Sequence, residues 1–351
     1  MKVRYIEKED KKKIEKFYDI AYGRKHILKN KKHTTWQFKK NPFLKKNETS
    51  IIVIEQKENI ISHLGIIPTK LKFFSTIKKG IWHVSFFTLN EFRGKGLGLK
   101  SVKLSNKRYD FAMVLSGSEG TEHIYKHIHG HTLGDLNRYI KIINQKKIQV
   151  FLKKKILLKK ISKSNKKYRI KRIKKLNKKY ENFWKDVRER FPITTERTKE
   201  YMTWRFLKHP LIDYHVMILE NGKKIAGIAV IRFENENKRI KAARIVDLII
   251  KKEFDDEMIF SIIEYCKDKS DFIDFYCTGD FYSKTMKKYG FFNNTIKTLK
   301  IPTVFNPIDF ERRTNINFLY ADLKKNVNPQ ILKNENNWFF VKADSDQDRS
   351  Y

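Results

Sequence analysis

The chain has 351 residues, of which 77 are Lys or Arg and 39 are Asp or Glu, and its net charge is +38. Hydrophobic residues make up 40% of it, which excludes disorder caused by low hydrophobicity, and the length allows two ordinary domains. No apolar run approaches the ~20 residues of a membrane span and the start has no apolar signal segment, so we expect a cytoplasmic protein.

The first ninety residues predict a helix, a β-hairpin and a further strand. A helical pattern covers residues 10–21 and is followed by the octet "TWQFKKNP" at 35–42. The apolar segment "SIIVIEQKENIISHLGII" predicts two strands joined by a turn, and "HVSFFTLNEF" predicts another strand that ends at Phe92.

A glycine-rich segment follows this strand and precedes a helical pattern; it consists of Arg93, Gly94, Lys95, Gly96, Leu97 and Gly98. Glycines let the backbone turn sharply, and the free N–H groups at a helix N-terminus attract phosphate. Arg93 and Lys95 add two cationic donors. Because no Lys-Ser/Thr pair follows the last glycine, the segment is not a Walker A loop. It predicts another kind of phosphate-binding loop.

The pattern R-x-x-G-x-G at a strand-to-helix junction resembles the acyl-CoA pyrophosphate loop of the GNAT (GCN5-related N-acetyltransferase) superfamily. The resemblance implies that these six residues bind acetyl-CoA, or another acyl-CoA, as co-substrate. It also implies an oxyanion contact from backbone at the end of the preceding strand, where Leu89 and Asn90 lie, so Leu89 joins the predicted cofactor-binding set. No metal is expected.

The next segment, "FAMVLSGSEGTEHIYKHIHGHT", predicts a strand and a helix that precedes Gly130. By the same resemblance, Tyr125 corresponds to the tyrosine that protonates the departing CoA thiolate, although it stands five residues before the glycine instead of four. The candidates for the base are His83, Glu119, Glu122 and His123, and of these His83 and Glu122 join Tyr125 as the predicted catalytic residues. Packing alone is the alternative for Tyr125 and His83. The nearby histidines 123, 127, 129 and 131 lack the third ligand of a recognised zinc pattern.

A basic stretch joins the two halves of the chain. Residues 141–179 hold 18 Lys or Arg and no Asp or Glu. Apolar residues between Val150 and Ile161 are interspersed among them. The stretch is either a solvated linker, assigned to 146–178, or a surface for a polyanion or an anionic membrane.

The second half repeats the first. The octet "TWRFLKHP" at 203–210 shares five of eight residues with the earlier one, and a hairpin with an Asn-Gly turn, a strand ending in Glu-Phe, a helix, a strand and another helix follow at offsets of 168, 162 and 160 residues. Asp255, Asp256, Glu257 and Met258 stand where the first half has its glycine-rich segment. Because three carboxylates repel a pyrophosphate, we expect no CoA there.

These observations predict an α/β fold with mixed sheets: two GNAT-like domains in tandem, the second degenerate, plus a C-terminal extension. The domains are placed at 1–145, 179–300 and 301–351, with the linker between the first two. Trp36 and Trp204, one in each octet, either stack on a sugar or pack at a domain edge. Cys266 and Cys277 are expected to be reduced and buried.

The extension is expected to hold one strand near Trp338 to Lys342 and an acidic tip. The tip, "DSDQDR" at 344–349, resembles the endings of tandem GNAT-like proteins associated with bacterial surface-polysaccharide synthesis. That resemblance implies an acceptor such as an amino sugar or a glycan precursor.

The predicted function is therefore acyl-CoA-dependent N-acyl transfer, most simply of acetyl, to a small amine. The alternatives are a nucleic-acid-associated protein, or a protein at the inner face of the membrane, with a vestigial GNAT fold. No obligate protein partner is expected.

Overall fold

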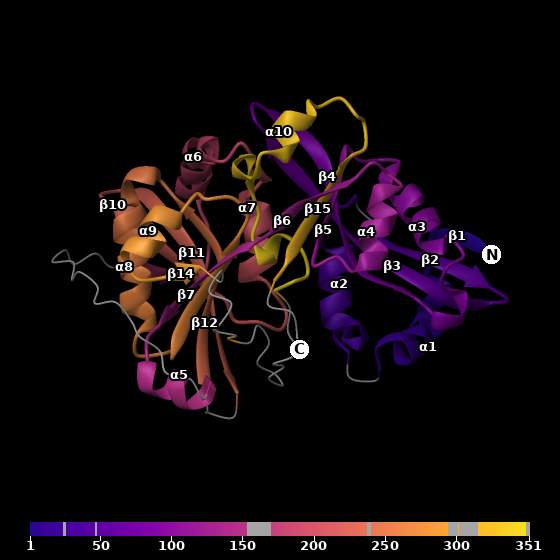
Figure 1. The fold of residues 1–351 in the computed structure, drawn as a ribbon, viewed down its shortest axis with the longest axis horizontal. Coiled ribbons are helices and arrows are strands. Elements are labelled where there is room, and N and C mark those ends of the chain that lie inside the picture. The colour runs from indigo at the N-terminus through magenta and orange to yellow at the C-terminus, as the bar shows by residue number, and fades with distance from the viewer. Residues whose placement is uncertain are drawn as a thin grey trace.

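The computed structural model describes residues 1–23, 26–45, 48–152, 170–236, 240–293, 301 and 315–348, which form two sheets side by side with helices around them (Figure 1). The helices are α1 (Lys11–Tyr22), α2 (Lys31–Lys39), α3 (Leu97–Asn106), α4 (Glu119–Lys126), α5 (Gln145–Leu152), α6 (Lys178–Val187), α7 (Lys199–Met202), α8 (Asp255–Cys266), α9 (Ser283–Lys288) and α10 (Pro329–Lys333). The mixed α/β class predicted from the sequence is confirmed.

The first sheet is built mainly from the first half of the chain. Its strands lie in the order β1 (Lys2–Tyr5), β2 (Ile51–Gln56), β3 (Asn59–Phe73), β4 (Thr76–Thr88), β5 (Phe111–Leu115), β15 (Asn317–Asp322) and β6 (His131–Asp135). The pairs are antiparallel except that between β4 and β5, which is parallel and is joined through α3. Two short strands, β9 (Ile193–Thr195) and β16 (Trp338–Phe339), extend it beside β3.

The second sheet has the same plan. Its strands lie in the order β8 (Ile170–Ile173), β10 (His215–Asn221), β11 (Lys224–Glu236), β12 (Ile240–Ile250), β13 (Phe272–Cys277), β7 (Asn137–Ile142) and β14 (Phe292–Asn293). Here too the central pair, β12 and β13, is parallel. The predicted hairpin turn is confirmed: β10 and β11 are joined through Gly222, whose φ is +58°.

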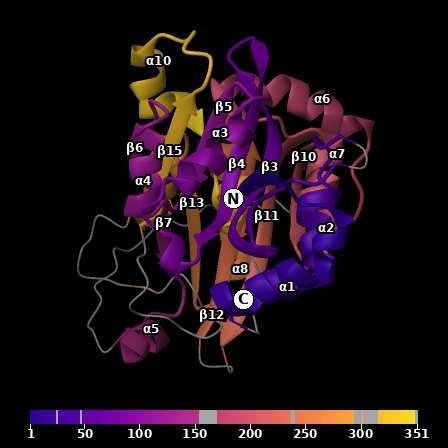
Figure 2. The ribbon, with the colours of Figure 1, turned by 90° about the vertical axis from the view of Figure 1, so that its right-hand side faces the viewer.

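The two sheets exchange one strand each. The first half's last strand, β7, pairs with β13 in the second sheet, and β15 of the C-terminal extension pairs with β5 and β6 in the first. In Figure 2, seen from the side of the first half, the yellow β15 lies among the purple strands. A division of the chain at residue 145 therefore does not separate the sheets, and β8, inside the predicted linker, is an edge strand of the second.

The repeated octets meet at the contact between the halves. The indoles of Trp36 and Trp204 are buried and stacked, with centroids 4.9 Å apart. Each indole N–H donates to the backbone carbonyl of the other Trp, at 2.9 and 3.0 Å. The two tryptophans thus make a near-symmetric contact, and packing, rather than stacking on a sugar, is their role.

Three further predictions concern the cysteines, membrane-spanning helices and the basic stretch. Cys266 and Cys277 are both free and buried, as predicted. No helix in the described residues is long and apolar enough to cross a membrane. Much of the basic stretch, residues 153–169, lies outside the described residues, while Ile148 of α5 packs into a small core on the second sheet.

Candidate active site

The central parallel strands of the first sheet separate at their carboxyl ends. Residues of β4 and β5 pair from Gly80 and Phe111 to Trp82 and Met113, yet β4 runs on to Thr88. On its other side β4 shifts register with β3 by one residue, close to Ser85, whose φ is +49°. This bulge bends β4 away from β5 and opens the sheet, in the place where α/β sheets commonly bind ligands.

The glycine-rich segment lies at this opening and forms the N-terminus of α3. Gly94 and Gly96 have φ values of +75° and +69°, and nothing lies within 4 Å of the position that a Cβ would occupy at either residue. Gly96 is the N-cap, and no side chain caps the helix. The first N–H groups of α3 therefore have no partner within the helix, and its positive end favours an anion.

A groove of about 740 Å³ runs past this helix end. The glycine-rich segment, residues 86–88 of β4 and the first turns of α4 line it. Arg93 is at the groove, where its Nε donates to the carbonyl of Thr88 at 3.0 Å and its guanidinium lies over the ring of Phe87. Gly98 is needed for packing, because a Cβ there would lie 2.7 Å from side-chain atoms of Phe86 and Ile124.

Two members of the predicted cofactor-binding set do not line the groove. Lys95 Nζ instead donates to the carbonyl of Glu91 at 3.1 Å. The side chain of Leu89 is buried in the core, and its amide donates to the carbonyl of Ile61 at 3.0 Å. The structure thus gives no support to Leu89 as the oxyanion donor, since its N–H is already used within the sheet; the strand opens four residues earlier, at the bulge.

A smaller cavity of about 310 Å³ continues the groove into the opening between β4 and β5. Phe86, Ser118, Thr121 and Ile124 line both spaces, so the two are contiguous. The polar side chains that line the cavity include those of Tyr22, His26, His83, Ser85, Tyr125, Asp346 and Gln347.

Two of the three predicted catalytic residues meet in this cavity. Tyr125 of α4 and His83 of β4 are 1% and 5% exposed, and the Tyr125 hydroxyl lies 2.9 Å from His83 Nδ1. His83 Nε2 lies 2.9 Å from the hydroxyl of Ser105, which itself donates to the carbonyl of Val102 at 2.7 Å. The proton of His83 is therefore on Nε2, and Nδ1 accepts from Tyr125.

Burial fixes the charge of this pair. It lowers the pKa of His83 to about 3 and raises the pKa of Tyr125 well above its ordinary value. Both groups are therefore neutral near pH 7. His83 then acts as a hydrogen-bond acceptor that holds the Tyr125 hydroxyl in place, which differs from the role of base predicted for it.

The third predicted catalytic residue, Glu122, lies apart from the other two. It is on α4, but its carboxylate accepts from the side-chain amide of Asn317 at 2.7 Å and it lines neither the groove nor the cavity. Glu122 therefore helps to join α4 to β15. A carboxylate does line the cavity, but it comes from the other end of the chain.

That carboxylate belongs to Asp346, in the acidic tip of the C-terminal extension. Ser85 Oγ donates to Asp346 Oδ2 at 3.1 Å, and Gln347 Nε2 donates to the carbonyl of Leu115 on β5 at 3.3 Å. The tip thus bridges β4 and β5 where they separate. Sequence reasoning singled out this tip but assigned none of its residues to the site, because nothing in the sequence places residue 346 beside residue 85.

The second half of the chain holds the tip from both ends. Asp344 accepts from buried Arg197 at 3.2 Å, and Asp348 pairs with Arg232 at 3.1 Å and accepts from the hydroxyl of Tyr214 at 2.6 Å. Arg205 donates to the carbonyl of Ala343 at 2.7 Å. The outer two carboxylates of 344–348 are therefore bound to the second half, and the middle one faces the cavity of the first.

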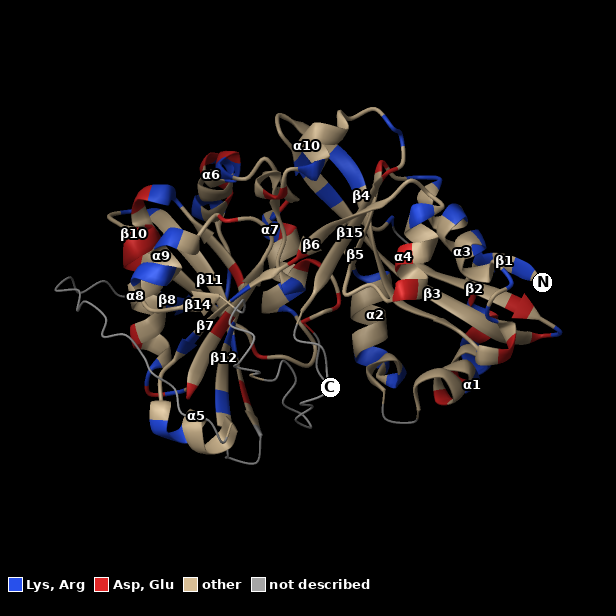
Figure 3. Cartoon of the chain, in the orientation of Figure 1, with Lys and Arg blue, Asp and Glu red and all other residues tan. Residues whose placement is uncertain are grey.

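Other predicted sites lie outside this region. Near the basic stretch, Lys141 is buried and donates to the carbonyl of Tyr289, Lys147 pairs with Asp271, and Lys171 pairs with Glu220. Lys and Arg also lie on elements of both halves, such as α3 and α9 (Figure 3). Within the described residues, no group of three or more His, Cys, Asp or Glu is arranged to hold a metal ion.

Comparison with solved structures identifies the fold. The match to a GCN5-related N-acetyltransferase from Anabaena variabilis covers 92% of this chain and 73% of that chain, with a TM-score of 0.60 and 9% sequence identity. The match to N-myristoyltransferase from Saccharomyces cerevisiae with bound myristoyl-CoA covers 92% of this chain and 82% of that chain, with a TM-score of 0.56 and 13% sequence identity. The match to a probable N-acyltransferase from Enterococcus faecalis covers 92% of this chain and 72% of that chain, with a TM-score of 0.58 and 11% sequence identity.

These likenesses establish a GNAT-like fold over most of the chain, as the sequence predicted. At such low identity they concern the fold alone. No family model and no curated protein matches the sequence.

Proposed function

We propose that the protein is an acyl-CoA-dependent N-acyltransferase whose first half binds the CoA. The observation that carries this proposal is the continuous space from the open N-terminus of α3 to the buried pair of Tyr125 and His83. The solved structures of similar fold, which include an enzyme with bound myristoyl-CoA, support it.

Each part of this space suits one part of a thioester substrate. The helix end, with Arg93 beside it, offers N–H donors and positive charge to the pyrophosphate. The bulge at Ser85 separates β4 from β5, so that the pantetheine arm enters between them. Tyr125 is then placed to give its proton to the departing thiolate, and the cavity holds the acyl group and the acceptor.

The size of the cavity favours a short acyl chain and a small acceptor. Its volume of about 310 Å³ is at the low end of the ~300–1,000 Å³ typical of small-molecule sites, and it must hold both reacting groups. We therefore propose acetyl as the acyl group. The acidic tip, which resembles endings of proteins linked to surface polysaccharides, favours an amino sugar or glycan precursor as the acceptor.

Isothermal titration with acetyl-CoA tests the binding step. Gly96→Val puts a side chain into the open space at the helix end and should lower acetyl-CoA affinity at least a hundredfold. Gly222→Val is the matched control, because Gly222 also has a positive φ, +58°, with nothing within 4 Å of its Cβ position, but it lies in the second half's hairpin. Both variants carry similar backbone strain, so equal affinities would refute the proposed site.

The rival functions have no comparable support. A polyanion or membrane surface would rest on residues 141–179, of which 153–169 lie outside the described residues. Of the described basic residues there, Lys147 and Lys171 are already in ion pairs. These rivals stay predictions from the sequence.

A further inference from the structure

We infer that Asp346 is a catalytic residue of this acyl-transfer site: its carboxylate binds the ammonium group of the acceptor and takes its proton. The inference rests on the proposed function. It makes the site bipartite, with CoA bound by the first half and the proton acceptor supplied by a segment that the second half holds.

The position of Asp346 is the first argument. Its side chain lines the same cavity as those of Tyr125 and His83, and the residue is 7% exposed. The hydroxyl of Ser85, at the bulge of β4, donates to it at 3.1 Å. A carboxylate at this place lies at the strand opening through which the thioester of a bound acyl-CoA would pass.

The charge of the two spaces is the second argument. Asp346 is the one carboxylate among the described residues that line the cavity. The imidazole of His26, stacked on the ring of Tyr22, also lines it, and no described Lys or Arg does. The groove, in contrast, has Arg93 and the positive end of α3. The groove therefore attracts the phosphates of one substrate, and the cavity attracts a cation, as an acceptor ammonium is.

The rigidity of the tip is the third argument. Asp344 is bound to Arg197 and Asp348 to Arg232 and Tyr214, while Gln347 is bound to the end of β5. These four contacts hold the backbone on both sides of Asp346. Such fixing is what a group that must meet a reacting atom requires, because small displacements cost large factors in rate.

The chemical steps balance with these residues. Asp346 takes one proton from the ammonium, and the neutral amine attacks the thioester carbonyl carbon, forming a C–N bond. The C–S bond then breaks, and the sulfur leaves with a proton from the Tyr125 hydroxyl. The nitrogen's second proton returns to the tyrosine, and Asp346 releases its proton to water. The products are the amide, CoA thiol and one proton.

The experiment compares wild type with Asp346→Asn, which keeps the shape and still accepts from Ser85 but has no charge. Release of CoA thiol from acetyl-CoA is measured with ethanolamine, glycine, putrescine and glucosamine, and with glucose as an acceptor without an amine. Asp322→Asn is the control, because Asp322 is in the same extension, where it accepts from turn amides of Lys324, Lys325 and Val327.

We expect an amine, but not glucose, to accelerate thiol release by the wild type. Asp346→Asn should lower kcat/KM for that amine at least a hundredfold while acetyl-CoA affinity stays within twofold. Asp346→Glu should recover part of the loss, and Asp322→Asn should be fully active. An Asn variant with more than a third of the wild-type activity would overturn the inference.

The pH profile separates a proton acceptor from a merely structural residue. Without Asp346, only acceptor that is already neutral reacts, so the variant's rate should rise about tenfold per pH unit up to the pKa of the amine. A structural role would lower the rate equally at every pH. If acetyl-CoA binds but none of the amines is acylated, the inference fails; if acetyl-CoA does not bind, the proposed function itself fails.

Discussion

The two halves of this chain share one fold but treat the strand-to-helix junction in opposite ways. In the first half, Gly94 and Gly96 leave the N-terminus of α3 open. In the second, α8 begins with Asp255, which pairs with Arg190 through two contacts of 2.6 and 2.7 Å. An ion-paired carboxylate thus stands at the start of this helix, where the first half has open backbone.

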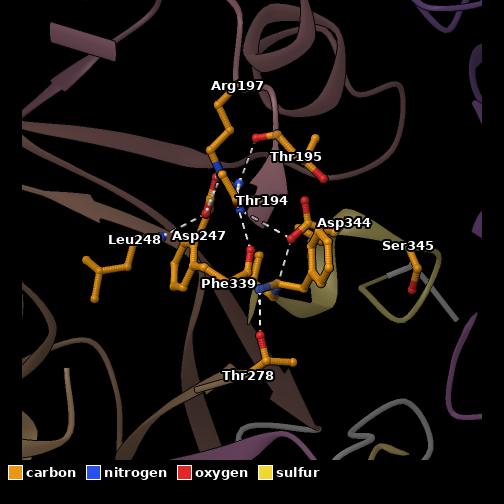
Figure 4. Close-up of polar contacts among 12 residues, drawn as sticks. Thr194, Thr195, Arg197, Asp247, Leu248, Thr278, Phe339, Asp344 and Ser345 are labelled. Carbon is orange, nitrogen blue, oxygen red and sulfur yellow. Dashed lines mark hydrogen bonds and ion pairs between the residues drawn. The ribbon is translucent and has the colours of Figure 1, made fainter. Parts of the chain in front are cut away.

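The strand that precedes the junction also carries different side chains in the two halves. Counted back from the Glu-Phe pair that both halves share, Ile245 stands at the position of His83 and Asp247 at that of Ser85. Asp247 is buried and bound by Arg197, whose Nη1 also donates to Thr194 and Thr195 (Figure 4). Where the first half has a cavity and a polar pair, the second has an ion-pair network.

The corresponding positions therefore have different uses in the two halves. Arg197 binds Asp247 of its own half and also Asp344, at the start of the acidic tip. Asp247, at the position that corresponds to Ser85, thus belongs to the network that holds the tip, in which Asp346 lines the cavity of the first half.

The largest effect is expected from Tyr125→Phe, which removes the proposed acid of the first half. Turnover should fall about a hundredfold or more, since a placed acid contributes 10²–10⁴ in rate, while acetyl-CoA affinity should change little. Steady-state kinetics with the best amine acceptor and titration with acetyl-CoA measure the two quantities. Tyr282→Phe is the control, because that buried tyrosine donates to the carbonyl of Leu248 in the second half. Full activity of Tyr125→Phe would leave the residue a packing role.

Arg197→Met should destabilise the protein most. It leaves Asp247 and Asp344 buried without their cation, and such a loss costs about 3–5 kcal/mol of unfolding free energy. Adding Asp247→Leu should restore part of the stability, because one uncompensated charge is then gone. Arg108→Met is the control: its ion pair with Glu48 is exposed and contributes less than about 1 kcal/mol. Denaturant titration measures the unfolding free energy of the wild type, the two single variants and the double variant. A double variant that is less stable than Arg197→Met would contradict the ion-pair explanation.

Sequence reasoning predicted what depends on local pattern. The alternating apolar residues of 50–67 and 214–233 gave both hairpins, the glycine spacing gave the open helix end, and the repeated octets gave the duplication. Tyr125 and His83 were selected separately, and they meet at 2.9 Å. Each of these signals lies within a few residues of the feature that it predicts.

What the sequence did not predict depends on contacts between distant residues. The segment 317–322 is an internal strand of the first sheet, but its partners, β5 and β6, lie about 200 residues earlier. No local pattern distinguishes such pairing from that of an ordinary edge strand. The exchange of β7 and β15 between the sheets was not predicted for the same reason, because it too depends on pairing between distant segments. Asp346 was missed for this reason too, since its partner Ser85 is 261 residues away.

Arg93→Asp gives the first half the residue type that begins α8 in the second. A hydrogen bond to a charged group contributes about 1.5–3 kcal/mol, so acetyl-CoA affinity should fall roughly ten- to a hundredfold, with further loss from repulsion of the pyrophosphate. Titration at low and high salt measures it, and the affinity difference from wild type should shrink as salt rises. Arg108→Asp is the control: Arg108 does not line the groove, so this variant should bind acetyl-CoA as the wild type does. If both variants lost affinity equally, net charge rather than the site would be the cause.

The smallest effect is expected in the pH dependence of stability. It depends on His83, at whose position the second half has Ile245. Burial holds the pKa of His83 at about 3, below the ordinary 6.5 that it has when unfolded. Below pH 6.5 the unfolded chain therefore binds a proton that the folded chain does not, so this contribution to stability is complete above pH 6.5 and is lost as the pH falls toward 3. By pH 5 the loss amounts to about 2 kcal/mol. His83→Gln cannot titrate but still has groups for Ser105 and Tyr125, so its unfolding free energy should fall by about 2 kcal/mol less than that of wild type between pH 7 and pH 5. Equal losses in denaturant titrations would mean that His83 is charged in the folded protein, and the proton assignment at Tyr125 would then be wrong.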